Sequence, residues 1–122
     1  MDAIVAVESR GLIFGAALAY RLGIGLVLVR KAGKLPHTTI KKTYSLEYGE
    51  GVLEVHDDSL RPGMRVVLVD DLLATGGTMG AVIGLTEHFK AQIVELAFLV
   101  ELTDLHGRQM LTPHPTFALI QY

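Results

Sequence analysis

The sequence predicts an α/β fold, an open and mainly parallel β-sheet flanked by helices. Residues 66–69 form an uninterrupted apolar run that is too short for a helix and typical of a strand buried on both faces. The runs at 3–7 and 66–69 are each followed by a glycine-bearing turn and then by apolar residues at helical spacing. A chain of 122 residues is long enough for one domain with a real core, so we expect residues 1–122 to form a single domain.

Composition excludes several classes of protein. The net charge is -2 with both signs dispersed, which argues against a general nucleic-acid-binding surface. The chain has no cysteine, so it has neither a disulfide framework nor a thiolate metal site. No apolar run approaches the roughly 20 residues of a membrane span, and the first residues lack the basic start of a signal peptide. We therefore expect a soluble, cytoplasmic protein.

The first strand is expected at residues 3–7, followed by a helix. Ser9 is placed to cap that helix, and Gly23 is placed to stop it. Arg10 would then lie in the first helical turn, where a positive charge opposes the helix dipole. Either Arg10 is simply solvated, or an anion docks there.

The second strand is expected at residues 24–29, with a basic turn after it. The turn holds three cations, Arg30, Lys31 and Lys34, together with a glycine. A solvated turn explains an isolated cluster of this kind well. The alternative is a ligand-binding turn, because ligands of open α/β sheets gather at the carboxyl ends of the strands.

Residues 37–58 form a long polar excursion with strand-like alternation at 51–56. We interpret the segment as a hairpin-like lid, because long loops in compact domains are usually functional or disordered. On the residues alone, Glu47 near its centre is an exposed hairpin charge.

The stretch from Arg65 to Thr78 organises the rest of the chain. Its strand ends in Asp70 and Asp71, and the turn at 74–78 leads into a helix that runs to about residue 90. The unpaired backbone N–H groups at a helix start, two glycines and two threonine hydroxyls together make an anion site. The aspartates would suit the adjacent hydroxyls of a sugar with a phosphate on each side and a divalent cation; alternatively, one is a cap and the other is solvated.

The remaining elements continue the α/β pattern. A turn at 60–63 leads into the central strand, and another buried strand is expected at 93–100. Prolines at 113 and 115 interrupt the chain before a last strand, expected at the sheet edge, over 117–120. The five histidines show no metal-ligand spacing.

Four motifs in order resemble those of the type I phosphoribosyltransferases, and in particular the adenine phosphoribosyltransferase family. They are Glu8-Ser9-Arg10-Gly11, the basic turn at 30–36, the loop at 44–49, and Val69-Asp70-Asp71-Leu72-Leu73-Ala74-Thr75-Gly76-Gly77-Thr78. The resemblance extends from about Val5 to Tyr122. It implies the type I phosphoribosyltransferase fold with a flexible lid hairpin, and transfer of a 5-phosphoribosyl group from phosphoribosyl pyrophosphate to adenine, giving AMP and pyrophosphate in purine salvage.

The resemblance also implies roles for individual residues. Glu47 would be the general acid/base, and Leu102 would contact the purine ring, although a core leucine at a strand end explains Leu102 equally well. The ribose hydroxyls and the 5′-phosphate would be bound by Asp70, Asp71, Ala74, Thr75, Gly76, Gly77 and Thr78. The pyrophosphate would be bound by Arg10, Arg30, Lys34 and Tyr48.

Three further expectations come from the resemblance. Mg²⁺ would arrive with phosphoribosyl pyrophosphate rather than on direct protein ligands. A homodimer is implied, in which Arg30 can reach the neighbouring subunit. Family members have an N-terminal segment that this chain lacks, including part of the hood over the base, so the hood is expected to be truncated. A catalytically weak or inactive phosphoribosyl-pyrophosphate-binding module of the same fold is therefore the alternative.

Overall fold

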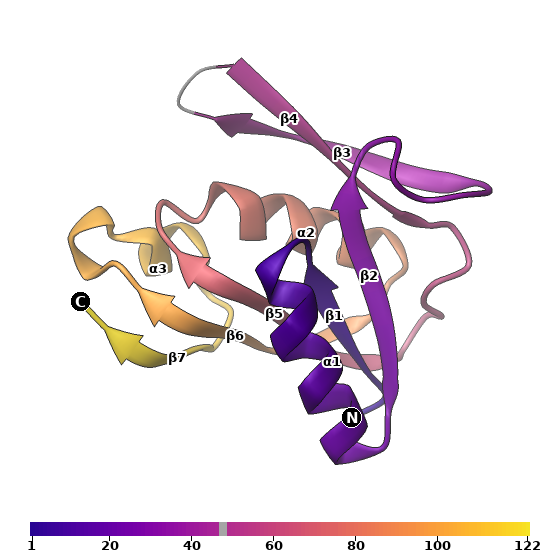
Figure 1. Ribbon diagram of the computed structural model, residues 1–122, viewed down its shortest axis with the longest axis horizontal. Coiled ribbons are helices and arrows are strands. Elements are labelled where there is room, and N and C mark those ends of the chain that lie inside the picture. The colour runs from indigo at the N-terminus through magenta and orange to yellow at the C-terminus, as the bar shows by residue number, and fades with distance from the viewer. Residues whose placement is uncertain (47–48) are drawn as a thin grey trace.

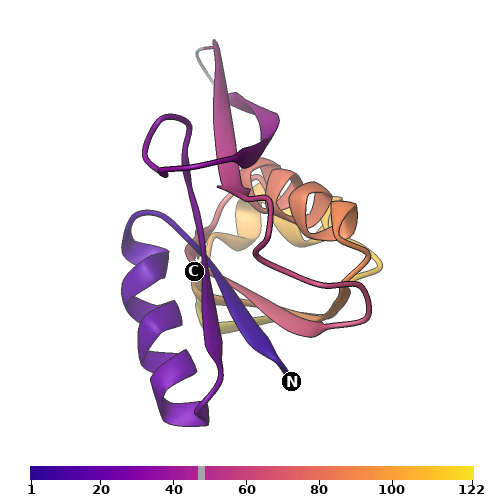
Figure 2. The same ribbon diagram turned by 90° about the vertical axis from the view of Figure 1, so that its right-hand side faces the viewer.

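The computed structural model describes residues 1–46 and 49–122, which form a seven-stranded sheet with helices on both faces (Figures 1 and 2). The strands are β1 (Ala3–Val7), β2 (Gly25–Lys31), β3 (Thr39–Leu46), β4 (Gly49–His56), β5 (Arg65–Leu73), β6 (Gln92–Glu101) and β7 (Thr116–Gln121). The helices are α1 (Arg10–Leu22), α2 (Gly77–His88) and the short α3 (Gly107–Met110), which follows the 3-10 turn η1 (Thr103–Leu105).

The strand order is β3-β4-β2-β1-β5-β6-β7. The five strands from β2 to β7 in this order pair in parallel, whereas β4 is antiparallel to both β2 and β3. The predicted mainly parallel α/β fold is thus confirmed. From β1 the chain proceeds outward to β2, and from β5 it proceeds outward in the other direction, so the order reverses between β1 and β5. Such a reversal opens a crevice at the carboxyl ends of the two strands, where ligands of this fold class bind.

The core has two layers, one on each face of the sheet. Leu68, Val82 and Leu96 lie fully buried between the sheet and α2. On the other face, Ile4 and Ala6 of β1 pack in the cluster beneath α1. All five residues of β1 are buried, as expected for a strand covered on both faces. No helix in the described part of the chain is both long and apolar enough to span a membrane.

Two local predictions need correction. Gly23 ends α1 in the left-handed conformation as predicted (φ 68°), but the Ser9 hydroxyl does not cap the helix. The Ser9 backbone is already helical (φ -105°, ψ -43°) rather than extended as at a side-chain cap. The second strand also continues through Arg30 and Lys31, which we had placed in the turn, because β4 pairs with these two residues.

The segment between β2 and β5 forms the predicted hairpin. Strands β3 and β4 pair from Thr39–His56 to Leu46–Gly49, and the hairpin stands above α2 (Figures 1 and 2). Only Glu54 and Leu53 of β4 pair with β2. The hairpin is therefore joined to the main sheet at its base, and it overhangs the carboxyl ends of the parallel strands.

Candidate active site

The two aspartates at the end of β5 lie in different environments. Asp70 is only 8% exposed, and its Oδ1 accepts a hydrogen bond from the Asp71 backbone N–H at 2.8 Å. Burial raises the pKa of Asp70 to about 8, reinforced by the neighbouring Asp71 carboxylate and opposed by the Asp71 N–H and the Arg10 charge. Asp71 is more open and forms an ion pair with Arg10, with 2.6 Å between Oδ2 and Nε. The pair therefore offers one buried and one accessible carboxyl group.

The turn after β5 is built to hold an anion. Gly76 has a φ of 92°, a left-handed conformation that favours glycine. Helix α2 starts at Gly77, and no side chain caps it in the described part of the chain; only the Thr75 hydroxyl lies near, 3.4 Å from the Gly77 nitrogen. Free N–H groups and the positive end of the helix dipole thus face the turn.

The aspartates and the turn line a single cavity of about 200 Å³. Its walls are Arg10, Asp70, Asp71, Leu72, Leu73, Ala74, Thr75, Gly76, Gly77, Thr78, Met79 and Phe98. The structure thus brings together all seven residues predicted for the ribose and the 5′-phosphate. Phe98, a β6 residue, was missed because nothing in its sequence context distinguishes it from a core aromatic residue.

A second cavity of about 320 Å³ adjoins the first and lies under the hairpin. It shares Arg10, Asp70, Asp71 and Thr78 with the first cavity. Its other walls are Val7, Glu8, Ser9, Lys31, Tyr44 and Leu53. The aspartate pair therefore stands at the junction of the two cavities, with the cations Arg10 and Lys31 on the second one.

Gly11 explains how α1 reaches this junction. A Cβ atom at Gly11 would lie 2.8 Å from Asp70 Oδ1 and 3.1 Å from the Asp70 Cα. The first turn of α1 therefore packs directly on the end of β5, which brings Arg10 to Asp71. This close approach requires a residue without a side chain at position 11, so Gly11 has a structural role in the site.

The other predicted site residues lie outside the two cavities or outside the described residues. Arg30 donates its Nε–H to Glu8 Oε1 at 3.1 Å, and Lys34 is exposed on the basic turn. Leu102 is half-buried, and its N–H is bonded to the Leu73 carbonyl oxygen. Glu47 and Tyr48 fall outside the described residues.

Glu8 and Glu54 are buried or half-buried carboxylates that shape the basic turn. Glu8 accepts the Lys31 N–H at 2.7 Å as well as the Arg30 bond. Burial works to raise the pKa of Glu8, but these hydrogen bonds and the two cations outweigh it and lower the pKa. Glu54 is 2% exposed and accepts the N–H groups of Gly33 and Leu35 at 3.1 and 2.9 Å. The alternating pattern of β4 gave no sign that Glu54 faces inward.

The oxygen donors of the site fit a cation that is carried by a phosphorylated ligand. No group of three or more histidines, aspartates or glutamates able to hold a metal occurs among the described residues. Mg²⁺ typically keeps several waters and binds through substrate phosphates with few protein carboxylates. A pair of neighbouring aspartates beside an anion-binding turn suits that mode of binding better than a dedicated protein cage.

Comparison with known proteins identifies the family. The family model for the phosphoribosyl transferase domain matches residues 1–116. This chain belongs to the phosphoribosyltransferase family. The family is the one predicted from the sequence motifs, which include the aspartate pair and the turn of this phosphoribosyltransferase.

The individual relatives and solved structures that match include several adenine phosphoribosyltransferases. The phosphoribosyltransferase is 56% identical to the adenine phosphoribosyltransferase of Chloroflexus aurantiacus over all 122 residues, which cover 70% of that protein. The crystal structure of the adenine phosphoribosyltransferase of Thermoanaerobacter pseudethanolicus matches with a TM-score of 0.96 and 51% identity, over 99% of this chain and 70% of that one. The Saccharomyces cerevisiae enzyme, complexed with adenine and an imino-altritol bisphosphate, matches at a TM-score of 0.94 and 45% identity, over 98% and 67%. The predicted type I phosphoribosyltransferase fold is confirmed.

Proposed function

We propose that this phosphoribosyltransferase transfers the 5-phosphoribosyl group of phosphoribosyl pyrophosphate to N9 of adenine, giving AMP and pyrophosphate. The observation that carries the proposal is that Asp70, Asp71 and the turn at 74–78 line one cavity, in a chain similar to adenine phosphoribosyltransferases along its whole length. In the reaction the bond from C1′ to the pyrophosphate oxygen breaks and the bond from C1′ to N9 forms. The ribose ring therefore gains positive charge in the transition state.

The phosphoribosyl half of the donor belongs in the first cavity. The 5′-phosphate accepts hydrogen bonds from the backbone N–H groups of the turn 74–78, at the positive end of α2. The ribose hydroxyls donate to Asp70 and Asp71. Two contacts at opposite ends of the sugar fix its position, which orients C1′ toward the second cavity.

The pyrophosphate belongs in the second cavity, under the hairpin. Arg10 and Lys31 line that cavity. We assign Lys34 and Tyr48 of the same chain, together with Arg30 of the neighbouring subunit, to the pyrophosphate as well. Positive charge there stabilises the negative charge that develops on the departing pyrophosphate. Mg²⁺ bound to the donor supplies further charge neutralisation and orients the phosphates.

In this proposal the adenine ring is contacted by the lid and by Leu102. We propose that residues 37–58 close over the bound donor as a lid and that Glu47, as the general acid/base, accepts the proton that N9 of adenine loses when the bond to C1′ forms. Leu102 would pack against the ring. Phe98 lines the first cavity and is a second apolar candidate for such a contact.

We further propose that the enzyme works as a homodimer in the cytoplasm. Arg30 would contribute to the neighbouring subunit after release from Glu8, its partner in the single chain. The absence of cysteine from the sequence suits a reducing compartment.

A coupled assay tests the proposed function directly. Formation of AMP and pyrophosphate is measured with adenine, Mg²⁺ and phosphoribosyl pyrophosphate, and release of pyrophosphate is then measured with hypoxanthine or guanine in place of adenine. We expect AMP formation by the wild type and none by the double variant Asp70→Asn/Asp71→Asn. Glu87→Gln/Asp104→Asn is the control, because it neutralises two exposed carboxylates that line neither cavity and lie outside the lid. A wild type that binds phosphoribosyl pyrophosphate without turnover would instead favour the inactive binding module.

A further inference from the structure

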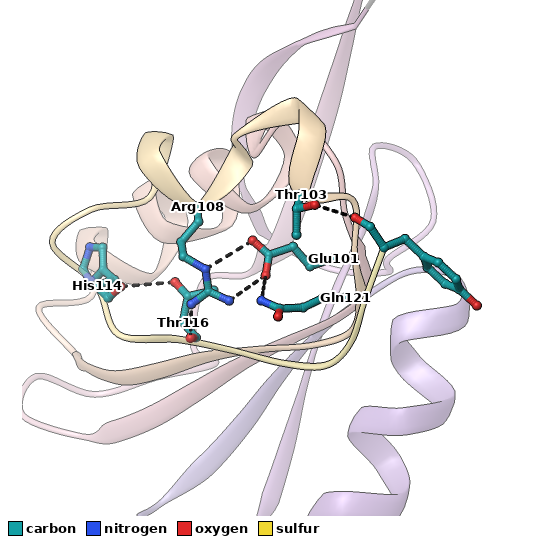
Figure 3. A network of polar contacts seen from close by, with 7 residues as sticks. Glu101, Thr103, Arg108, His114, Thr116 and Gln121 are labelled. Atoms are coloured by element: carbon teal, nitrogen blue, oxygen red, sulfur yellow. Dashed lines mark hydrogen bonds and ion pairs between the residues drawn. The ribbon is translucent and has the colours of Figure 1, made fainter.

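A polar network at the end of β6 joins side chains of β6, α3 and β7 that lie outside both cavities (Figure 3). Glu101, the last residue of β6, is 4% exposed. Arg108 of α3 grips its carboxylate with two bonds, Nε to Oε2 at 3.2 Å and Nη2 to Oε1 at 2.6 Å. Gln121 of β7 donates to the same Oε1 at 2.9 Å, and Arg108 Nη1 also donates to the Thr116 carbonyl oxygen.

The network holds both partners in their charged forms. The hydrogen bonds from Arg108 and then Gln121 lower the pKa of Glu101 despite its burial. The bond to Glu101 likewise raises the pKa of Arg108. A two-pronged contact between a guanidinium and a carboxylate is strong and geometrically specific, so it fixes the position of Arg108 as well as its charge.

The helix that carries Arg108 needs such an anchor. Helix α3 has four residues, Gly107–Met110, far fewer than an isolated helix requires for stability. One anchor is apolar, the buried Leu111 that follows the helix. The other is the ion pair between Arg108 and Glu101, which fixes α3 relative to the ends of β6 and β7.

Helix α3 in turn abuts the anion-binding turn. A Cβ atom at Gly107 would collide with the Ala74 carbonyl oxygen and come within 2.9 Å of Leu73 Cδ1. A Cβ atom at Gly76 would lie 2.9 Å from the Gly107 carbonyl oxygen and 3.2 Å from Met110 Cβ. Neither Gly107 nor Met110 lines the first cavity, so α3 supports the turn from outside it.

We infer that Arg108, held by Glu101, is a positioning residue for the 5′-phosphate of the substrate. The ion pair fixes α3, and α3 fixes the backbone of residues 74 and 76, whose turn presents its N–H groups to the phosphate. This inference rests on the proposed function, because it assigns the 5′-phosphate to that turn. Arg108 itself touches no substrate.

The inference predicts a selective loss of binding. Ribose 5-phosphate probes the turn, whereas magnesium pyrophosphate probes the second cavity, which α3 does not touch. In Arg108→Gln and in Glu101→Gln we expect the affinity for ribose 5-phosphate to fall by about 10- to 10²-fold, the usual effect of losing hydrogen bonds to a charged group. The affinity for magnesium pyrophosphate should stay within about twofold. Because the phosphate is held equally in the ground and transition states, KM for the donor should rise with little change in kcat.

Arg108→Lys and Thr103→Val complete the experiment. Arg108→Lys keeps the charge but loses the two-pronged contact. It should stay folded and recover only part of the affinity that Arg108→Gln loses. Thr103→Val removes a hydrogen bond to the Tyr122 carbonyl oxygen in the same corner of the fold and leaves both partners of the Arg108–Glu101 ion pair in place, and it should bind both probes normally. Titration calorimetry gives the affinities, and thermal unfolding shows whether each variant is folded.

The outcomes separate this inference from the proposed function. A folded Arg108→Gln or Arg108→Lys that binds ribose 5-phosphate like the wild type overturns the positioning role and leaves the proposed function intact. Equal losses for both probes also overturn it, because they indicate general destabilisation. A wild type that binds no ribose 5-phosphate overturns the proposed function, and the inference falls with it.

Discussion

Asp70 lies between the first turn of α1 and the end of β5, and this position sets its charge state. Gly11 approaches its carboxylate so closely that a Cβ atom there would lie 2.8 Å from Oδ1. Since burial raises the pKa of Asp70 to about 8, most molecules carry a proton on this carboxyl group at neutral pH. Asp71, one residue further along, is instead paired with Arg10. The two adjacent aspartates therefore have different environments, because the Asp70 side chain is buried in the fold and the Asp71 side chain pairs with the exposed Arg10.

The charge state of Asp70 predicts how stability depends on pH. The pKa is 3.8 in the unfolded chain and about 8 in the fold, so the folded protein binds more protons between these values and loses stability as the pH rises through them. Asn does not titrate. We therefore expect the melting temperature of Asp70→Asn to gain on that of the wild type from about pH 4 to pH 8 and the difference to stay constant above pH 9. Thermal unfolding across this range checks the trend; a difference that does not vary with pH would contradict it.

Gly76 is expected to tolerate no side chain. Its φ of 92° and the 2.9 Å approach of the Gly107 carbonyl oxygen both oppose a Cβ atom. Gly76→Ala should lower the free energy of unfolding by at least about 1–2 kcal/mol, the usual strain of a left-handed residue, and weaken binding of phosphoribosyl pyrophosphate. Gly80→Ala, inside the helix α2 that Gly76 precedes, is the control, because a Cβ atom at Gly80 meets nothing within 4 Å. It should be neutral or stabilising, and urea titration of both variants tests the contrast.

Glu47 is expected to act in turnover and not in donor binding. Removing a general acid/base typically costs about 10²–10⁴-fold, so Glu47→Gln should lower kcat within that range. The affinity for phosphoribosyl pyrophosphate should change little, since Glu47 is not among the residues proposed to contact either half of the donor. Glu87→Gln, at an exposed glutamate of α2 outside both cavities and outside the lid, is the control and should keep full activity. If Glu47→Leu turned over at the wild-type rate, Glu47 would have no acid–base role.

At the scale of elements, the lid hairpin and the basic turn behave as one unit through Glu54. Its Oε1 accepts two N–H groups of the turn, and its Oε2 accepts the Thr39 hydroxyl at the start of β3. The backbone hydrogen bond from Leu35 is the largest influence on the pKa of Glu54, and together with the other bonds it lowers that pKa despite burial. The turn that carries Lys34 is thus tied to the base of the hairpin.

Glu54→Gln should loosen this unit. An amide can replace only part of the acceptor capacity, so we expect a loss of about 1–3 kcal/mol in the free energy of unfolding at pH 7, as for hydrogen bonds to a charged group. Since the pKa of Glu54 is lowered in the fold, the wild type loses this advantage as the pH falls below 4.5. The gap between wild type and variant should therefore narrow as the pH falls below 4.5. Urea titration at pH 7 and pH 3 measures both values, with Glu50→Gln as the control; a gap of equal size at both pH values would count against the role of the charge.

The elements also show which parts of the fold and site could be predicted from the sequence. The strand at 3–7 and the turn at 74–78 could be predicted because each depends on neighbouring residues: an apolar run buried on both faces, and glycines at a helix start. The inward turn of Glu54 and the pairing of Glu101 with Arg108 depend on which strands become neighbours in space. The order of apolar and polar residues along the chain does not show which strands become neighbours. The prediction of Ser9 as a side-chain cap was wrong, because the residue type does not reveal that its backbone is already helical.

For the whole molecule, the expected assembly is a homodimer. Several large apolar side chains of α1 and β7 are exposed on one face of the single chain, among them Leu18, Phe117 and Leu119. Large exposed apolar areas commonly mark interfaces. Multi-angle light scattering at micromolar concentration should give twice the mass of 13.2 kDa, and Leu119→Lys should reduce the dimer fraction if that face is the contact. A monodisperse monomer would contradict the prediction.

The strand order has a consequence for how the chain folds. The central strand β1 pairs with β5, and Ala3 meets Val66 across about half the length of the sequence. That contact can form only after a long loop has closed, and non-local pairing of this kind slows folding. On the ribosome, β1, α1 and β2 emerge long before β5, and they expose one flank of β1 until β5 arrives. The candidate active site lies at the seam between β1 and β5, so it can be assembled only after this long-range contact has formed.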